Sequence, residues 1–170
     1  MAERTSAGVL LHRRAGGPGD RHEVLLSHPG GPFFAKRDLG DWTIPKGEPN
    51  GSDEPLEAVA RREFEEETGM AIDAAAPTVD LGTIVQKGGK VVHAWGVEGD
   101  LDAADARSNA FEMEWPPRSG LRERFPEIDR VEWFGLDEAR RRVKPTQVPL
   151  IDRLEAELEG RGDATAPAGP

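Results

Sequence analysis

Acidic side chains crowd one short stretch of this sequence, Arg62–Thr68. On a helix that turns about 100° per residue, Glu66 and Glu67 lie within about 60° of Glu63, because they follow it by three and four residues. Three carboxylates therefore share one side of the helix. The same side carries an apolar stripe, made of Leu56, Val59, Ala60 and Met70, with Phe64 at its margin.

Carboxylates on an apolar stripe are costly unless something positive compensates them. Like charges at these spacings repel by a few tenths of a kcal/mol, and withdrawal from water costs more. They also lie at the helix end that prefers cations. Arg62 reaches Glu66 at the four-residue spacing, but one arginine does not balance three acids. We therefore expect Glu63, Glu66 and Glu67 to bind Mg²⁺ or Mn²⁺. Glu57 and Glu65 fall outside the stripe and are expected to be solvated.

The helix that carries these acids is predicted over Asp53–Thr68. Ser52 or Asp53 can cap its start, and Pro55 fits only its first turn. Gly69 is the residue expected just past its end. The helix is therefore bounded on both sides by ordinary capping chemistry.

Strands and helices interleave along the rest of the chain. A short helix is predicted from Leu136 and an amphipathic C-terminal helix follows it. Loops are predicted at His28–Asp41 and Lys46–Gly51, and Gly99–Ile128 reads as irregular. The pattern predicts an α/β fold with a mixed sheet between helices. The predicted strands are Ala7–His12, His22–Ser27, Trp42–Pro45, Val79–Gln86, Val91–Val97 and Val131–Phe134, with turns at Ala15–Asp20 and Lys87–Lys90.

Length and composition fit one globular domain, predicted over residues 1–160, with a flexible C-terminal tail at 161–170. The 170 residues include no Cys, which excludes disulfides and thiolate metal sites. No signal region or membrane span is seen, so a cytoplasmic protein is expected. The net charge of −10 argues against a nucleic-acid polymer as partner. The sequence leaves monomer and homodimer open.

The acidic stretch, together with Gly47 and Glu54, resembles the box of the Nudix hydrolase family (MutT-related), G-x5-E-x7-R-E-U-x-E-E-x-G-U, where U is apolar. Every fixed residue is present, but six residues separate Gly47 from Glu54 where the family has five. The extra residue falls in a Pro/Gly/Asn loop, where insertion costs little. The resemblance covers most of the chain and implies a Nudix-type α/β/α sandwich with a mixed central sheet. Trp42–Gly47 and Lys87–Trp95 are also similar to segments of diadenosine tetraphosphate hydrolases.

The resemblance implies roles for the acids and for Arg62. Glu63, Glu66 and Glu67 would coordinate divalent ions, with the carbonyl of Gly47 as a further ligand. Arg62 would orient a glutamate by a charge-assisted hydrogen bond, and together these four charged residues form the expected catalytic set. Glu54 either braces the loop or takes part in the site. A further carboxylate is expected from outside the helix. Glu127 is the first choice for it, and Glu112 and Glu114 are its competitors.

Candidate substrate-binding residues are Lys46, Lys87, Lys90 and His93, which would contact phosphate oxygens or the nucleotide. The alternative for each lysine is ordinary solvation, and for His93 it is a satisfied histidine beside a packed Trp95. Phe33 and Phe34 either stack on a base or anchor their loop to the core.

The predicted reaction is Mg²⁺-dependent hydrolysis of a P–O–P linkage in a nucleoside diphosphate derivative, with a glutamate as proton acceptor. The favoured substrate is a small-molecule nucleotide, a dinucleoside polyphosphate such as diadenosine tetraphosphate. Alternatives are an oxidised nucleoside triphosphate, ADP-ribose or a diphosphoinositol phosphate. A non-catalytic nucleotide sensor is a competing class, although it need not retain the full acid set. A calcium-binding module would use an Asp-rich loop that this chain lacks.

Overall fold

The structure is a computed structural model that describes residues 4–16, 21–51 and 53–165. In that part of the chain, six strands form a mixed sheet in the order β4-β5-β1-β2-β8, with β3 paired to β1. β1 and β5 run parallel, and the other neighbours are antiparallel. The strands are β1 (Thr5–Arg14), β2 (His22–Pro29), β3 (Lys46–Gly47), β4 (Thr78–Val85), β5 (Val91–Glu98) and β8 (Ile128–Gly135).

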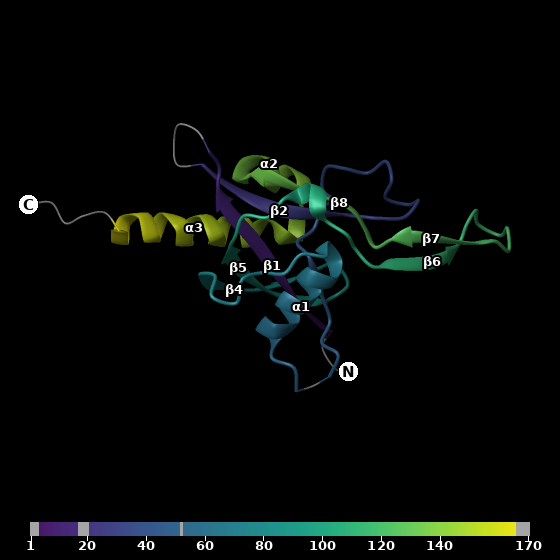
Figure 1. The fold of residues 1–170 in the computed structure, drawn as a ribbon, viewed down its shortest axis with the longest axis horizontal. Coiled ribbons are helices and arrows are strands. Elements are labelled where there is room, and N and C mark those ends of the chain that lie inside the picture. The colour runs from purple at the N-terminus through teal and green to yellow at the C-terminus, as the bar shows by residue number, and fades with distance from the viewer. Residues whose placement is uncertain (1–3, 17–20, 52, 166–170) are drawn as a thin grey trace, which may run out of the picture.

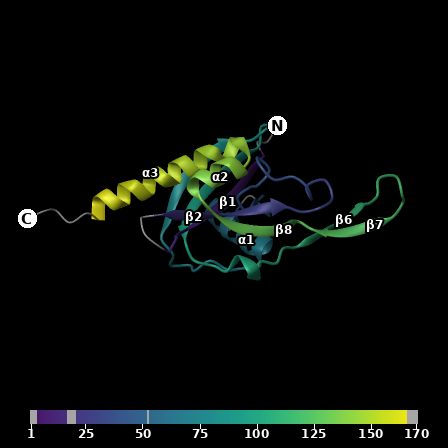
Figure 2. The same cartoon turned by 90° about the horizontal axis from the view of Figure 1, so that it is seen from above.

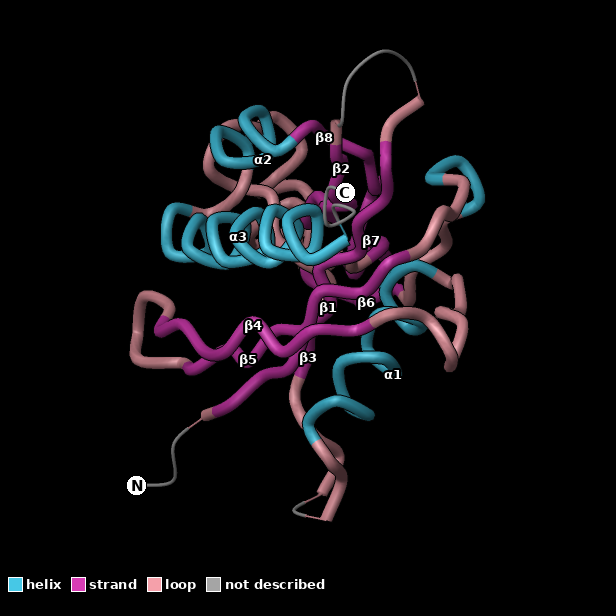
Figure 3. Tube along the Cα trace, turned by 90° about the vertical axis from the view of Figure 1, so that its left-hand side faces the viewer, coloured by secondary structure: helices cyan, strands magenta, loops and turns pink. Residues whose placement is uncertain are grey.

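Helices cover both faces of this sheet (Figures 1 and 3). Helix α1 (Leu56–Thr68) packs on one face, and α2 (Leu136–Arg142) and α3 (Val148–Thr165) pack on the other. Short 3-10 turns lie at Ala103–Asp105 and Pro145–Gln147. The predicted α/β/α sandwich with a mixed central sheet is thus confirmed. None of the helices within the described residues is long and apolar enough to cross a membrane.

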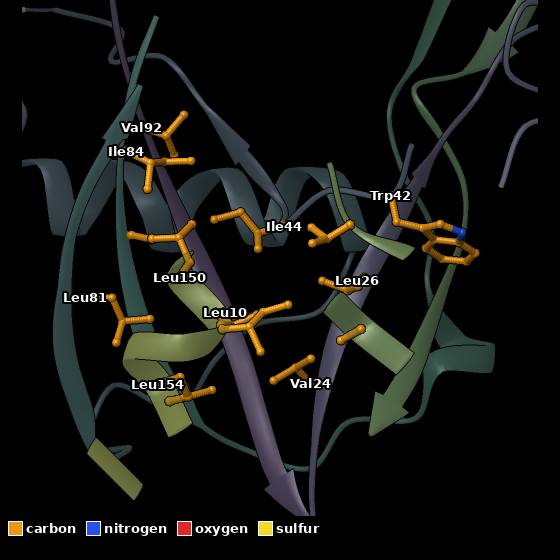
Figure 4. Packing of buried hydrophobic residues seen from close by; sticks show 14 of the residues in the cluster. Leu10, Val24, Leu26, Trp42, Ile44, Leu81, Ile84, Val92, Leu150 and Leu154 are labelled. Atoms are coloured by element: carbon orange, nitrogen blue, oxygen red, sulfur yellow. The ribbon is translucent and has the colours of Figure 1, made fainter. Parts of the chain in front are cut away.

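Strand β1 lies at the centre and is buried on both sides. Val9 and Leu11 face α1 and belong to the same apolar cluster as Phe64. Leu10 points to the opposite face, where it joins the cluster that contains Leu150 of α3 (Figure 4). A strand covered on both faces reads as a nearly continuous apolar run, which explains the sequence of β1.

The predicted strand Trp42–Pro45 is wrong. This stretch makes only isolated bridges, and the two-residue strand β3 follows it at Lys46–Gly47, inside the predicted loop. Pro45 has no N–H and cannot donate to a ladder. The N–H of Ile44 instead donates to the side chain of Gln147 at 3.0 Å. The other predicted strands are confirmed, with ends that differ by at most three residues.

The segment Gly99–Ile128 was expected to be irregular and instead contains a β-hairpin. β6 (Ala110–Glu114) pairs with β7 (Arg122–Pro126), and the pair extends away from the main sheet (Figure 2). Its turn carries no two-residue hairpin signal. Its strands are only five residues long, and β7 begins with three consecutive charged residues, so it lacks the alternation of a half-buried strand. Such short strands are hard to distinguish from loop in a sequence.

Helix α1 begins at Leu56, later than the predicted Asp53. Pro55 occupies the N-cap position with φ −59° and ψ 139°, and no side chain caps the first turn. The extended backbone at Pro55 keeps Asp53 in the preceding loop, so Asp53 is not the cap. Ser52, the other predicted cap, lies outside the described residues.

The C-terminal helix α3 continues to Thr165, whereas the sequence predicted a tail from residue 161. Its Leu150 and Leu154 are fully buried, as the four-residue spacing predicted, and Leu158 packs against the same cluster. Residues 166–170 lie outside the described part, as do residues 17–20 of the predicted turn Ala15–Asp20.

Candidate functional site

The apolar side of α1 packs onto β1 and carries the acids with it. Phe64 and Val59 are fully buried, which confirms the predicted apolar stripe. Gly69 ends the helix in the left-handed conformation, at φ 72°, and its N–H donates to the carbonyl of Glu65 at 2.7 Å. The helix therefore presents Glu63 and Glu67 toward the sheet.

Glu63 lies directly against β3. A Cβ built on Gly47 would overlap the Glu63 carboxyl group, so only glycine permits this approach. The extra residue between Gly47 and Glu54 therefore does not displace Gly47 from the helix. Burial raises the pKa of Glu63, as do the charges of Glu66 and Glu127, while the hydrogen bond from Arg62 lowers it.

Glu67 is held at the edge of β3. Its Oε2 accepts a hydrogen bond from the backbone N–H of Lys46 at 3.1 Å. Burial raises the pKa of Glu67 to about 8, with smaller contributions from the charges of Glu63 and Glu127. The bond from Lys46 and the charge of its side chain oppose this rise. A carboxylate in this position carries a charge that the protein compensates only in part.

Arg62 binds the carboxylates around it with its whole guanidinium group. It donates to both oxygens of Glu54, at 2.8 and 3.1 Å, and to the carbonyl of Glu48 at 3.2 Å. The same side chain donates to Glu63 at 2.7 Å and to Glu66 at 3.3 Å. These bonds raise the pKa of Arg62, and the bonds to Glu54 raise it most. Charge-assisted pairs of this kind fix the orientation of the acceptors.

Glu54 connects Arg62 to the loop before the helix. Its Oε2 also accepts from the backbone N–H of Asn50 at 3.0 Å, and the bond from Arg62 lowers its pKa. Of the two roles considered for Glu54, these contacts favour bracing of the loop.

Of the three carboxylates considered from outside the helix, Glu127 lies nearest the acids of α1, close enough to raise the pKa of both Glu63 and Glu67. It sits at the junction of β7 and β8, where its N–H donates to the carbonyl of Asn109 at 2.8 Å. Glu112 and Glu114 instead lie exposed on β6, away from the sheet. Glu112 forms an ion pair with Arg122 at 3.7 Å.

The donor set of this cluster suits a hard divalent ion. Within the described residues, no group of three or more His, Cys, Asp or Glu side chains already converges closely enough to hold a metal ion. The donor atoms that the glutamates offer are all carboxylate oxygens, which Mg²⁺ and Mn²⁺ prefer. Burial has left Glu63 and Glu67 with raised pKa values, so a cation at this point would stabilise their ionised forms.

The backbone N–H of Lys46 binds Glu67, whereas its side chain points away from the acids. In β3, Gly47 pairs with Ala7 and Lys46 pairs with Gly8. Because successive residues of a strand point to opposite faces, the Lys46 side chain lies on the face of the sheet opposite the one that Gly47 presents to Glu63. Burial, with a smaller contribution from the charges of Lys90 and Lys144, lowers the pKa of Lys46 to about 8. Lys46, Lys90 and Lys144 therefore lie close enough for their charges to interact, and the charge of Glu67 also reaches Lys46. Lys144 was not predicted from the sequence, because nothing local marks a residue that only the fold brings near Lys46.

The other candidate lysines differ in their surroundings. Lys90 lies 3.9 Å from the carboxylate of Glu48, which it reaches across the loop. Lys87 is exposed in the turn between β4 and β5. The structure thus brings Lys90 close enough to Lys46 for its charge to lower the pKa of Lys46.

His93 has partners within the fold. Its Nε2 lies 2.7 Å from the carboxylate of Asp80 on β4, and its ring stacks on Trp95 at 4.1 Å. Trp95 is buried beneath α1. These contacts favour the satisfied histidine over a substrate ligand. Phe33 is 61% exposed and meets Trp115 edge-on at 5.6 Å.

Solved structures share this fold at low identity. A Caenorhabditis elegans Ap4A hydrolase in a binary complex is 20% identical, with a TM-score of 0.60 over 92% of this chain and 98% of that one. The NUDIX domain of Shewanella oneidensis NrtR complexed with ADP ribose is 17% identical, with a TM-score of 0.62 over 93% and 90%. A mutT/nudix family protein from Listeria innocua is 15% identical, with a TM-score of 0.62 over 97% and 99%. These likenesses show the fold.

The family itself is shown by the sequence match. No curated protein matches the chain at a significant level. The NUDIX domain, however, matches residues 2–154, which is most of the chain and includes all the acids of α1. This chain belongs to the NUDIX domain family.

Proposed function

We propose that this protein hydrolyses a P–O–P linkage in a nucleoside diphosphate derivative with the help of Mg²⁺ or Mn²⁺. The observation that carries the proposal is the partly buried acid cluster of α1, in which Glu63 rests on Gly47 and Glu67 accepts from the N–H of Lys46. Most members of the NUDIX family are pyrophosphohydrolases, which supports the same reaction class.

Glu63, Glu66, Glu67, the carbonyl of Gly47 and Glu127 are the groups that would hold the ions. The bound ions would supply positive charge that polarises the phosphoryl group and lowers the pKa of water. Arg62 keeps Glu63 and Glu66 in place through its hydrogen bonds. A glutamate of the cluster takes the proton of the attacking water, which requires a group within hydrogen-bond reach of that water.

The lysines beside the cluster would hold the phosphate chain. Lys46 and Lys90 lie close together, and their charges destabilise each other in the absence of an anion. A polyphosphate would relieve that repulsion. Lys87 and His93 remain candidates with less support, because Lys87 is exposed in its turn and His93 already has Asp80 as a partner.

The favoured substrate is a dinucleoside polyphosphate such as diadenosine tetraphosphate. The segment Trp42–Gly47 and the neighbouring lysines support this choice, and one similar structure is an Ap4A hydrolase. Another similar structure binds ADP ribose at comparable identity, so ADP-ribose is the first competitor. The acidic chain, with a net charge of −10, favours a small nucleotide over a nucleic-acid polymer as partner.

The test is a panel of diphosphates incubated with the full chain and Mg²⁺, with identification of the released products. Diadenosine tetraphosphate, ADP-ribose, an oxidised nucleoside triphosphate and a diphosphoinositol phosphate form the panel. The expected result is Mg²⁺-dependent cleavage with preference for diadenosine tetraphosphate. Glu66→Gln should abolish cleavage, whereas Glu57→Gln, on the exposed side of the same helix, should not. Preference for ADP-ribose would refute the substrate, and no cleavage of any member would refute the reaction.

A further inference from the structure

A cavity of about 540 Å³ opens beside the acid cluster, at the C-terminal end of α1. One wall comes from the helix and includes Arg62 and Glu66. The opposite wall is the chain segment Arg107–Asn109. The volume is in the range of small-molecule sites.

Hydrogen bonds fix the outer wall of this cavity to both elements that carry the acids. The N–H of Arg107 donates to the carbonyl of Thr68, the last residue of α1, at 2.6 Å. At the other end, the carbonyl of Asn109 accepts from the N–H of Glu127 at 2.8 Å. Gly69 allows the close approach, because a Cβ there would stand 2.7 Å from the carbonyl oxygen of Arg107.

Ser108 adds a second attachment to the start of β8. Its hydroxyl accepts from the N–H of Ile128 and donates to the carbonyl of the same residue, both at 3.0 Å. The wall is therefore held in place before any ligand arrives, which reduces the ordering cost of binding.

The two arginines of the cavity differ in their free donors. Arg62 is saturated by the carboxylates and the carbonyl already described. Arg107 donates through Nη1 to the carbonyls of Ala104, at 3.3 Å, and Ala106, at 2.6 Å. Its Nε and Nη2 have no acceptor among the residues that the structure describes. A guanidinium held by one nitrogen presents the other two as a planar fork, which matches two oxygens of a phosphate.

We propose that this cavity is a phosphate subsite of the hydrolase, in which Arg107 binds the terminal phosphate of a nucleotide next to the ions. The inference rests on the proposed function, because Glu65 and Glu66 also line the cavity and would repel a phosphate unless divalent ions balance them.

Calorimetric titrations of the full chain with AMP and with adenosine, each at millimolar Mg²⁺, test this assignment. AMP contains no P–O–P linkage and remains intact, and adenosine lacks the phosphate. Arg107→Met should weaken AMP binding about tenfold and leave adenosine binding unchanged. Arg107→Lys should retain part of the affinity, because an ammonium group is a point charge without the fork. Arg124→Met, which removes an exposed arginine on β7, is the matched control and should change neither.

The outcomes separate this inference from the proposed function. AMP binding that is absent in the unmodified protein, or unaffected by Arg107→Met, would overturn the subsite whatever the enzyme hydrolyses. Equal weakening of AMP and adenosine would also overturn it, since Arg107 would then contact the nucleoside. A titration with Mg²⁺ alone, together with the diphosphate panel, judges the proposed function independently.

Discussion

Glu67→Gln should make the metal-free protein more stable, and the gain should depend on pH. Burial raises the pKa of Glu67 in the folded state to about 8, from an ordinary value of 4.5. The folded protein therefore holds this proton more tightly than the unfolded chain does. The cost of an ionised Glu67 is absent below about pH 4.5, grows as the pH rises toward 8 and is constant above it. A glutamine in the same place stays neutral throughout and can still accept from the N–H of Lys46.

The size of the effect follows from the same shift. The full difference in pKa corresponds to about 5 kcal/mol at the rate of 1.36 kcal/mol per unit. The Glu67 side chain is only partly buried, so solvent reduces this to about 2 kcal/mol. For a chain of this length, that free energy corresponds to a shift of about 4–8 °C in the melting temperature. The pH range of this effect does not overlap that of Lys46. Because the pKa of Lys46 is lowered from 10.5 to about 8, its contribution to stability changes only between those two pH values.

The assay is differential scanning calorimetry in EDTA at pH 5, 6.5 and 8. The melting temperature of Glu67→Gln should exceed that of the unmodified protein by a margin that widens with pH. Glu57→Gln makes the same chemical change on the exposed side of α1 and should show no such trend. Mg²⁺ added at pH 8 should stabilise the unmodified protein and have much less effect on Glu67→Gln. A margin that is flat with pH, or a less stable variant at pH 8, would refute the burial argument.

Three further predictions concern Gly47, Lys90 and Glu127. Gly47→Ala should lower both the melting temperature and kcat, because the added Cβ would overlap the Glu63 carboxyl group. Unchanged thermal melts and an unchanged kcat would contradict the close approach of Glu63 to Gly47. Lys90→Ala should raise KM about threefold or more for a long polyphosphate substrate but less for a short one, since only the longer chain reaches Lys90. An equal rise in KM for both substrates in steady-state kinetics would mean that Lys90 is an ordinary solvated lysine. Glu127→Gln should weaken Mg²⁺ activation, read from the Mg²⁺ dependence of kcat, whereas Glu112→Gln should leave it unchanged because Glu112 pairs with Arg122 on the hairpin. Similar Mg²⁺ dependence in both variants would remove Glu127 from the ion site.

Local patterns in the sequence were enough to predict the helices and strands whose apolar residues follow one regular spacing. The apolar stripe of α1, the continuous apolar run of β1 and the spacing of Leu150 and Leu154 each depend on residues within a few turns or pleats. The end of α1 at Gly69 follows from the freedom of glycine to adopt a positive φ. Patterns failed where a distant partner decides the outcome, as at Ile44, whose N–H is taken by Gln147.

The sequence by itself determined which chemistry the site offers, because the spacing of Glu63, Glu66 and Glu67 on one helix side is a local property of a periodic backbone. Only the tertiary structure decided what surrounds them. The packing brings Glu54 to Arg62 as a hydrogen-bond acceptor, and it brings Lys144 near Lys46. Residues 107–109 connect the end of α1 to Glu127 through backbone hydrogen bonds. These contacts join segments far apart in the chain, and their geometry depends on how the sheet, the helices and the loops pack together. Burial, which raises the pKa of Glu67, is likewise a property of that packing and not of the residue.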